Sequence, residues 1–199
     1  MFITCRAAAT ADCKLDGGKG TTLSLPNSIF EMPQINYTVT FYDKRGFGSL
    51  GIDGSSPQKK VHKLWLEDGA RYKNGIAVVK VNGADRYLAA ITKNFGTIGD
   101  LVYANLEDGT SLPLIVADEK SYKNTNNKGP VDNPELCMSS KATDPACYGH
   151  LSGKSLSVIE FEFDNDYLYK GLTSATQVKQ DWNTNQKVIS ISNCGSATQ

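Results

Sequence analysis

Residues 76–91 read I-A-V-V-K-V-N-G-A-D-R-Y-L-A-A-I, and residues 101–117 read L-V-Y-A-N-L-E-D-G-T-S-L-P-L-I-V-A. Each stretch holds two short apolar runs on either side of an Asn-Gly or Asp-Gly pair. Such pairs tolerate the positive φ angles of a tight turn, so each stretch predicts a β-hairpin. We therefore expect strands at 76–81, 86–91, 101–106 and 111–117, with turns at 82–85 and 107–110.

The rest of the chain adds strands but little helix. Alternating or β-branched runs predict strands at 36–42, 155–163 and 187–192. About seven strands at short spacing favour a mainly β fold, a barrel or a sandwich. A short capped helix is expected after Ser56-Pro57, with His62 on its solvent-facing side, and a second helix is expected around residues 172–178.

We expect one β-barrel domain at residues 34–199. The first 33 residues carry a Gly17-Gly18-Lys19-Gly20 run and predict an irregular arm or linker. Residues 121–153 begin as a polar segment and continue with prolines and cysteines, so they predict a long insertion loop. A connection of that length inside a compact domain is usually either functional or held by its own cross-link.

The five cysteines are Cys5, Cys13, Cys137, Cys147 and Cys194. None forms a C-x-x-C pair, which argues against a zinc ribbon or a thioredoxin motif. A local Cys137–Cys147 disulfide would close the insertion loop, and Cys5–Cys13 could do the same at the amino terminus; the alternative is five free thiols in a reducing compartment. A disulfide without a visible signal peptide would indicate an unusual route of export, such as that of a virion component.

Composition excludes several classes of protein. The 199 residues carry 21 Lys+Arg and 21 Asp+Glu, so the formal net charge is zero, which argues against a nucleic-acid partner. The longest apolar stretches fall far short of the ~20 residues of a membrane span. The first six residues have no apolar core of a signal peptide. We expect a soluble globular domain.

Few residues are arranged for known chemistry. The two histidines, His62 and His150, come without a G-x-S-x-G or H-E-x-x-H motif, and no glycine run has the spacing of a P-loop. We therefore expect no metal and no cofactor. Asp118 directly follows the apolar run that ends at Ala117, and partial desolvation favours the protonated form of a carboxyl group, which readies it as a general acid. The alternative is that Asp118 only opens a turn.

Two sets of short motifs extend this reading. The first set is Ala89-Ala90, then Gly96-Thr97-Ile98-Gly99-Asp100-Leu101-Val102, then Asn105-Leu106-Glu107-Asp108-Gly109-Thr110, then Ile115-Val116-Ala117-Asp118. The second set is the run from Leu106 to Pro113, then Asp118-Glu119-Lys120, then His150, then the run from Ser157 to Asp164.

The first set resembles the core of double-psi β-barrel domains, which include rare-lipoprotein-A-like lytic transglycosylases, 3D-type wall-cleaving domains and expansins. The second set is similar to barrel domains carried by phages and prophages of Gram-positive bacteria. Together the likeness covers about residues 76–192. It departs from the rare-lipoprotein pattern at Ile91, where a histidine is expected, and at residues 118–121, which read Asp-Glu-Lys-Ser in place of D-R-G-P.

The resemblance implies a double-psi β-barrel with a groove for cell-wall glycan strands. Asp118 would protonate the glycosidic oxygen, and a hydroxyl of the sugar itself would close an anhydro ring, so one carboxyl group suffices where ordinary glycosidases need two. Glu160 would form a second polar wall of the groove, and His150 would bond Asp118 or the sugar. The expected substrate-binding residues are Lys120, Tyr87, Asn126 and Tyr148.

The partner implied is peptidoglycan, and the setting is a virion or the host cell envelope. Expansins indicate an alternative, because the same barrel and aspartate can serve without cleavage. On that reading the chain is a carbohydrate-binding module, or a tail-tip or hub protein that assembles with other phage tail proteins or with copies of itself.

Overall fold

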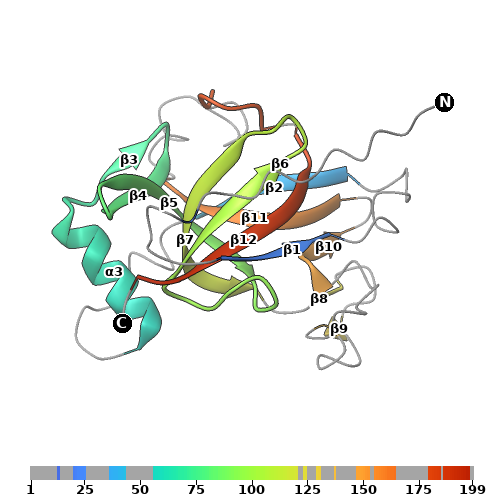
Figure 1. The fold of residues 1–199 in the computed structure, drawn as a ribbon, viewed down its shortest axis with the longest axis horizontal. Coiled ribbons are helices and arrows are strands. Elements are labelled where there is room, and N and C mark those ends of the chain that lie inside the picture. The colour runs from blue at the N-terminus through green and yellow to red at the C-terminus, as the bar shows by residue number, and fades with distance from the viewer. Residues whose placement is uncertain are drawn as a thin grey trace.

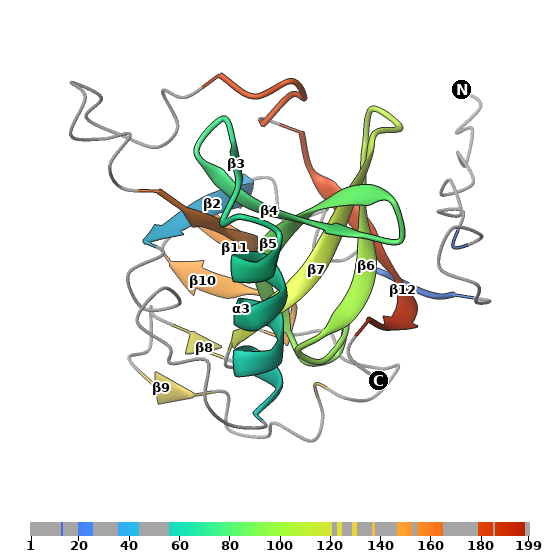
Figure 2. The same ribbon diagram turned by 90° about the vertical axis from the view of Figure 1, so that its left-hand side faces the viewer.

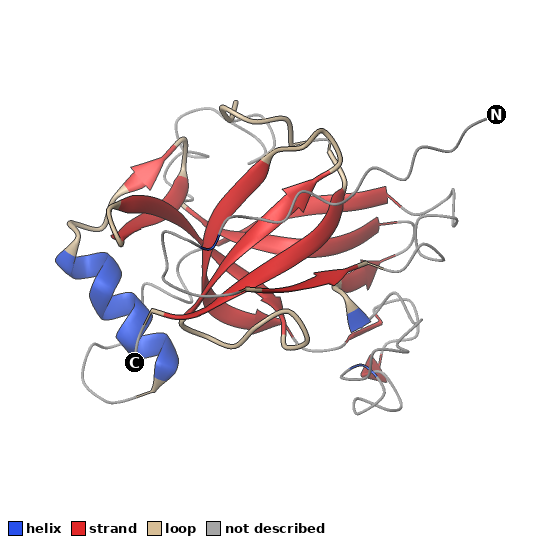
Figure 3. Ribbon diagram, viewed as in Figure 1, coloured by secondary structure: helices blue, strands red, loops and turns tan. Residues whose placement is uncertain are grey.

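The structure is a computed structural model that describes residues 13, 20–25, 36–43, 56–120, 123–124, 129–130, 137, 147–152, 155–164, 179–184 and 186–197. Strands dominate this part of the chain (Figure 3). The elements are β1 (Thr21–Ser24), β2 (Asn36–Asp43), α3 (Pro57–Glu67), β3 (Tyr72–Lys73), β4 (Ile76–Val81), β5 (Ala84–Thr92), β6 (Asp100–Leu106), β7 (Ser111–Lys120), β8 (Lys123–Asn124), β9 (Gly129–Pro130), β10 (His150–Ser152), β11 (Ser155–Phe163) and β12 (Val188–Ser196).

The strands form one 12-stranded sheet in the order β1-β12-β6-β7-β5-β4-β11-β10-β8-β9, with β2 attached to β11 and β3 attached to β4 (Figure 1). Three neighbouring pairs in this sheet run parallel, namely β5 with β7, β2 with β11, and the short β8 with β10. The order does not close into a ring among the described residues. The predicted mainly β fold is therefore confirmed, and the observed sheet is open.

The hairpins lie where the dipeptides predict them. Asn82 and Gly83 connect β4 to β5 with φ angles of 52° and 80°, as a two-residue turn of the mirror-image type requires. Gly109, with φ 91°, lies in the turn between β6 and β7. The second helix expected around residues 172–178 lies outside the described residues.

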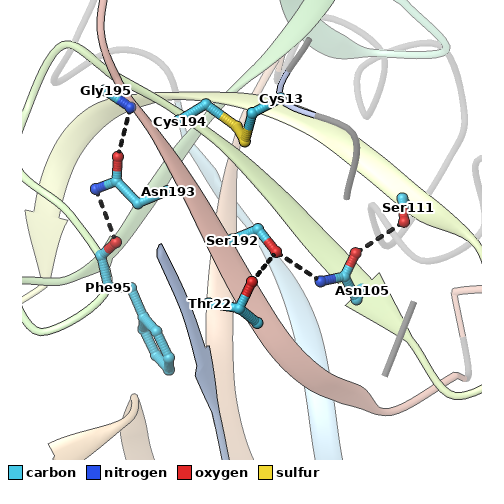
Figure 4. Close-up of a disulfide and its surroundings, with 9 residues drawn as sticks. All are labelled: Cys13, Thr22, Phe95, Asn105, Ser111, Ser192, Asn193, Cys194 and Gly195. Atoms are coloured by element: carbon cyan, nitrogen blue, oxygen red, sulfur yellow. Dashed lines mark hydrogen bonds between the residues drawn. A yellow bond between two sulfur atoms is a disulfide. The ribbon is translucent and has the colours of Figure 1, made fainter. Parts of the chain in front are cut away.

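Part of the expected amino-terminal arm belongs to the sheet. Strand β1 pairs antiparallel with β12, from Thr21 opposite Asn193 to Ser24 opposite Ser190. Hydrogen bonds continue this link through the side chains: Thr22 Oγ1 lies 2.8 Å from Ser192 Oγ, and Asn105 Nδ2 donates to the same Ser192 oxygen at 3.1 Å (Figure 4). Residues 20–25 are therefore not a loose linker.

Apolar side chains pack on both faces of the sheet. The larger cluster includes alternate residues of β5, namely Tyr87, Ala89 and Ile91. The smaller cluster includes Leu88 of β5 and lies under helix α3, which crosses the sheet in front of β4, β5 and β7 (Figure 2). This alternation follows from the two-residue period of a strand, and it divides the sheet into an inner face and an α3 face.

Helix α3 begins as its sequence predicts. Ser56 is the N-cap, its side chain accepts from Lys59 N at 3.4 Å, and Pro57 stands at the first turn. His62 is only 3% exposed and stacks on Trp65 with ring centroids 5.8 Å apart. The expectation that His62 faces solvent is therefore wrong, because residues three apart share one face of a helix and Trp65 packs on the sheet.

The described residues include two disulfides. Cys137 pairs with Cys147, as one reading of the sequence predicts. Cys13 pairs with Cys194 of β12 across 181 residues of sequence, so the local Cys5–Cys13 bridge is wrong (Figure 4). Closeness in sequence favours Cys5 as the partner of Cys13. The pairing of β1 with β12 instead brings Cys13 close to Cys194, near the end of the last strand.

The two bridges should differ in their effect on stability. In the chain-entropy account the long Cys13–Cys194 loop restricts the unfolded state more, by about 5 kcal/mol against about 3 kcal/mol for the ten-residue separation of Cys137 and Cys147. Urea unfolding of the Cys13→Ser/Cys194→Ser and Cys137→Ser/Cys147→Ser variants measures both. Equal losses, or a larger loss in the second variant, would contradict this assignment.

Candidate functional site

Two acidic residues flank a small residue on the α3 face of the sheet. Ala90 of β5 pairs with Asp118 of β7 on one side and with Glu160 of β11 on the other. Residues paired across neighbouring strands point to the same face, and two strand spacings put the Cα atoms of Asp118 and Glu160 roughly 10 Å apart. We call Asp118, Ala90 and Glu160 the carboxylate row.

A β-bulge in each outer strand sets this arrangement. In β7 the register shifts between Val116 and Asp118, so Ala117 is an extra residue. In β11 the register with β2 shifts between Ser157 and Ile159. A bulge allows consecutive apolar residues to stay buried, and it changes the face to which the following side chains point. For this reason Asp118 and Glu160, which follow the two apolar runs, lie on the same face of the sheet.

Asp118 is partly buried and is attached to helix α3. Its Oδ1 accepts a hydrogen bond from Gln58 Nε2 at 2.6 Å and another from the backbone N of Glu119 at 2.8 Å. Both bonds use Oδ1, so Oδ2 has no hydrogen-bond partner among the described residues. The first turn of α3 thus fixes one oxygen of this carboxyl group and leaves the other for a ligand.

Lys120 is buried against Glu160. Its side chain is 1% exposed, and its Nζ lies 3.0 Å from Glu160 Oε1. The same Nζ donates to the backbone O and the Oγ of Ser157, at 2.8 and 2.9 Å. The ammonium group therefore holds Glu160 and β11 in place, and it does not face solvent as a group that steers substrate would.

His150 lies on β10, on the side of β11 that is opposite to Lys120 and β7. Strand β10 pairs His150 with Ser157, and His150 Nδ1 lies 3.4 Å from Glu160 Oε1. His150 Nε2 is buried and has no hydrogen-bond partner among the described residues. The expected contact of His150 with Asp118 is not formed; its carboxylate partner is Glu160.

These contacts keep Glu160 ionised. Burial by itself would raise its pKa, but the hydrogen bond with His150 and the charge of Lys120 lower the pKa to about 2. Burial lowers the pKa of Lys120 to about 8, although the charge of Glu160 acts in the opposite direction. At neutral pH the pair is charged, so Glu160 provides a fixed negative charge and not a proton.

The remaining expected site residues lie elsewhere. Tyr87 is 5% exposed, packs edge-on against Phe161 and donates its OH to Asp181 Oδ1 at 3.3 Å. Tyr148 is 3% exposed and its ring lies against Phe95. Both rings belong to the core side of the sheet and do not present a stacking surface, and Asn126 lies outside the described residues.

The sequence reasoning missed three participants, namely Gln58, Ala90 in its role as a spacer, and Ser157. Ser157 precedes Glu160 in a stretch already singled out, but only the bulge puts the two side chains on one face. Nothing in the sequence links Gln58 to Asp118, because their contact depends on how α3 lies on the sheet.

Other kinds of site are not seen in the described part of the chain. Its His, Cys, Asp and Glu side chains form no group of three that could bind a metal ion. None of its helices combines the length and the apolar character that crossing a membrane requires.

The ionised state of Glu160 predicts a loss of stability in acid. Because its folded pKa lies below the ordinary value of 4.5, the pair stabilises the fold above that pH, and the contribution disappears as the pH falls toward 2. It amounts to about 3 kcal/mol at most. Urea unfolding between pH 6 and 2 should show a steeper decline for the native chain than for Glu160→Gln.

The control for this measurement is Glu67→Gln, whose carboxylate on α3 is 60% exposed. Its pH profile should follow that of the native chain. If Glu160→Gln also follows it, Glu160 is not held ionised by Lys120 and His150.

The chain matches no family model, no curated protein and no solved structure.

Proposed function

We propose that the protein cleaves the glycan strands of bacterial peptidoglycan, with Asp118 as the proton donor. The observation that carries this proposal is the carboxylate row, in which Asp118 and Glu160 flank Ala90 on one face of the sheet. A small residue between two acidic groups leaves room for a sugar ring, and paired carboxyl groups are the usual equipment for breaking glycosidic bonds.

The two carboxyl groups have different environments and so take different roles. Protonated Asp118 gives its proton to the glycosidic oxygen while the bond from that oxygen to C1 breaks. A hydroxyl group of the same sugar then bonds to C1, and its proton returns to Asp118. Asp118 Oδ2, which has no described partner, is the oxygen that would carry this proton.

Glu160 supports the reaction by charge. Positive charge develops on the sugar ring as the C1–O bond breaks, and a fixed carboxylate facing it lowers the barrier. The Lys120 contact ties up Oε1 of Glu160, which favours this electrostatic role over activation of a water molecule. Lys120 and His150 act on Glu160 and are positioning residues.

We also propose the finer fold, a double-psi β-barrel, for this chain. In its support, the parallel pairs β5–β7 and β2–β11 join strands that are separated in sequence, as crossing connections in such a barrel require. The proposed setting, a phage or prophage particle that penetrates the cell wall, rests on the resemblance. The two disulfides fit a compartment outside the reducing cytosol.

One observation favours the non-catalytic alternative, a wall-binding module or a tail-tip or hub protein. Gln58 holds Asp118 Oδ1 at 2.6 Å, and a carboxylate that joins a helix to a sheet can be purely structural. On this alternative the carboxylate row would bind a glycan strand without breaking it, or would not meet a glycan at all.

Substitution of Asp118 separates the two functions. Asp118→Asn keeps the size and the bond to Glu119 N but removes the transferable proton, so release of anhydromuramyl products from purified cell walls should fall by about 10²–10⁴-fold. Sedimentation of the variant with the same walls should be unchanged. Glu67→Gln, on exposed helix surface, is the matched control and should retain full product release.

Unchanged product release by Asp118→Asn would exclude Asp118 as the acid. Absence of product from the native chain, with wall binding intact in both variants, would establish the binding module in place of the enzyme. Far-UV circular dichroism of both variants confirms that the sheet is retained.

A further inference from the structure

A cavity of about 490 Å³ is lined by none of the residues of the carboxylate row. Its described lining comes from four places in the chain: strand β1, residues 93–100 from the loop after β5 to the first residue of β6, Cys137, and strand β12. The lining residues are Thr21, Thr22, Leu23, Lys93, Asn94, Phe95, Gly96, Thr97, Asp100, Cys137, Ile191 and Asn193. The volume falls in the range of small-molecule sites in proteins.

A network of hydrogen bonds fixes the wall of the cavity. Asn193 Nδ2 donates to Phe95 O at 3.2 Å, and Asn193 Oδ1 accepts from Gly195 N (Figure 4). Asn193 Nδ2 also donates to Asp100 Oδ2 at 2.8 Å. Thr97 N donates to the same Asp100 oxygen at 3.0 Å. Gly96 lies so near this pair that a Cβ would stand 2.9 Å from Asn193 Nδ2. The loop is therefore held in one shape before any ligand binds.

Several polar groups at the cavity are left over from this network. Asn94 Oδ1 accepts from Thr92, but Asn94 Nδ2 is buried and has no hydrogen-bond partner among the described residues. A buried donor without a partner costs stability, and a bound molecule would satisfy it. The ammonium of Lys93 is exposed, and Asp100 uses only Oδ2 in the bonds described above.

These leftover groups comprise donors and an acceptor, which suits a ligand that carries hydroxyl groups. Lys93 and Asn94 donate, the free oxygen of Asp100 accepts, and the Thr21 hydroxyl on exposed strand β1 can do either. The carboxylate of Asp100 opposes an anion, and a single carboxylate is too few for a cation site. Leu23, Phe95 and Ile191 add an apolar part to the lining, which suits a ring that carries hydroxyl groups at its edge and C–H groups on its faces.

We propose that this cavity binds a neutral, hydroxyl-rich saccharide unit. The choice of a sugar among such molecules rests on the proposed function, which it deepens. The carboxylate row lies on the α3 face, whereas Phe95 and Ile191 of the cavity belong to the larger cluster on the inner face, so the cavity is a site separate from the row.

The test uses the full chain with a β-1,4-linked N-acetylglucosamine tetramer, followed by ¹H–¹⁵N correlation spectra. Amide signals of residues 93–97 and 21–23 should shift on titration. Asn94→Ala and Lys93→Ala should each weaken binding at least tenfold, and Lys63→Ala, on the exposed surface of α3, should leave it unchanged. Thr21→Ala on the exposed strand β1 provides a further variant if Asn94→Ala fails to fold.

The outcomes separate this inference from the proposed function. Asp118→Asn should bind the tetramer at the cavity as the native chain does, even where it no longer releases product. An absence of shifts at residues 93–97, or unchanged affinity in Asn94→Ala, would overturn the cavity site and leave the role of Asp118 intact. Shifts caused by inorganic phosphate and not by the tetramer would also overturn it, since the site would then bind anions.

Discussion

The buried ion pair between Lys120 and Glu160 is the constraint on which the site depends. An ammonium group with a 1% exposed side chain needs a charged partner, because an unpaired buried charge is far more costly than a paired one. The pair spans three strands, since Lys120 belongs to β7, Glu160 belongs to β11, and β5 lies between them. The pair therefore fixes β7 and β11 relative to each other, and it holds Glu160 at one end of the carboxylate row.

The bulges make this pairing compatible with an apolar core. In a strand of strict alternation, Val158 and Ile159 could not both be buried in the larger cluster while Ser157 and Glu160 share the opposite face. The extra residue resolves the conflict, and the corresponding bulge at Ala117 does the same for Asp118. The bulges of β7 and β11 thus both lie close to Ala90. Bulges are often found next to functional sites.

The sequence predicts the local structure well and the long-range contacts poorly. The strands at 76–81 and 155–163 have the predicted limits, because turn dipeptides and apolar period act over a few residues. Burial of Lys120 and His62 and the Cys13–Cys194 bridge depend on which strands become neighbours, and no local pattern encodes that. The resemblance predicts Glu160, Lys120 and His150 as site residues, and the structure brings the three side chains together. It places Asp118 two strand spacings from Glu160.

The most direct measurement is a crystal structure of the Asp118→Asn variant with a β-1,4-linked N-acetylglucosamine tetramer bound. A sugar ring is expected over Ala90, with one glycosidic oxygen within hydrogen-bond distance of the substituted side chain and with C1 facing Glu160. A carboxylate row covered by the protein's own side chains, with the tetramer bound elsewhere, would contradict the proposal that this row acts on glycan.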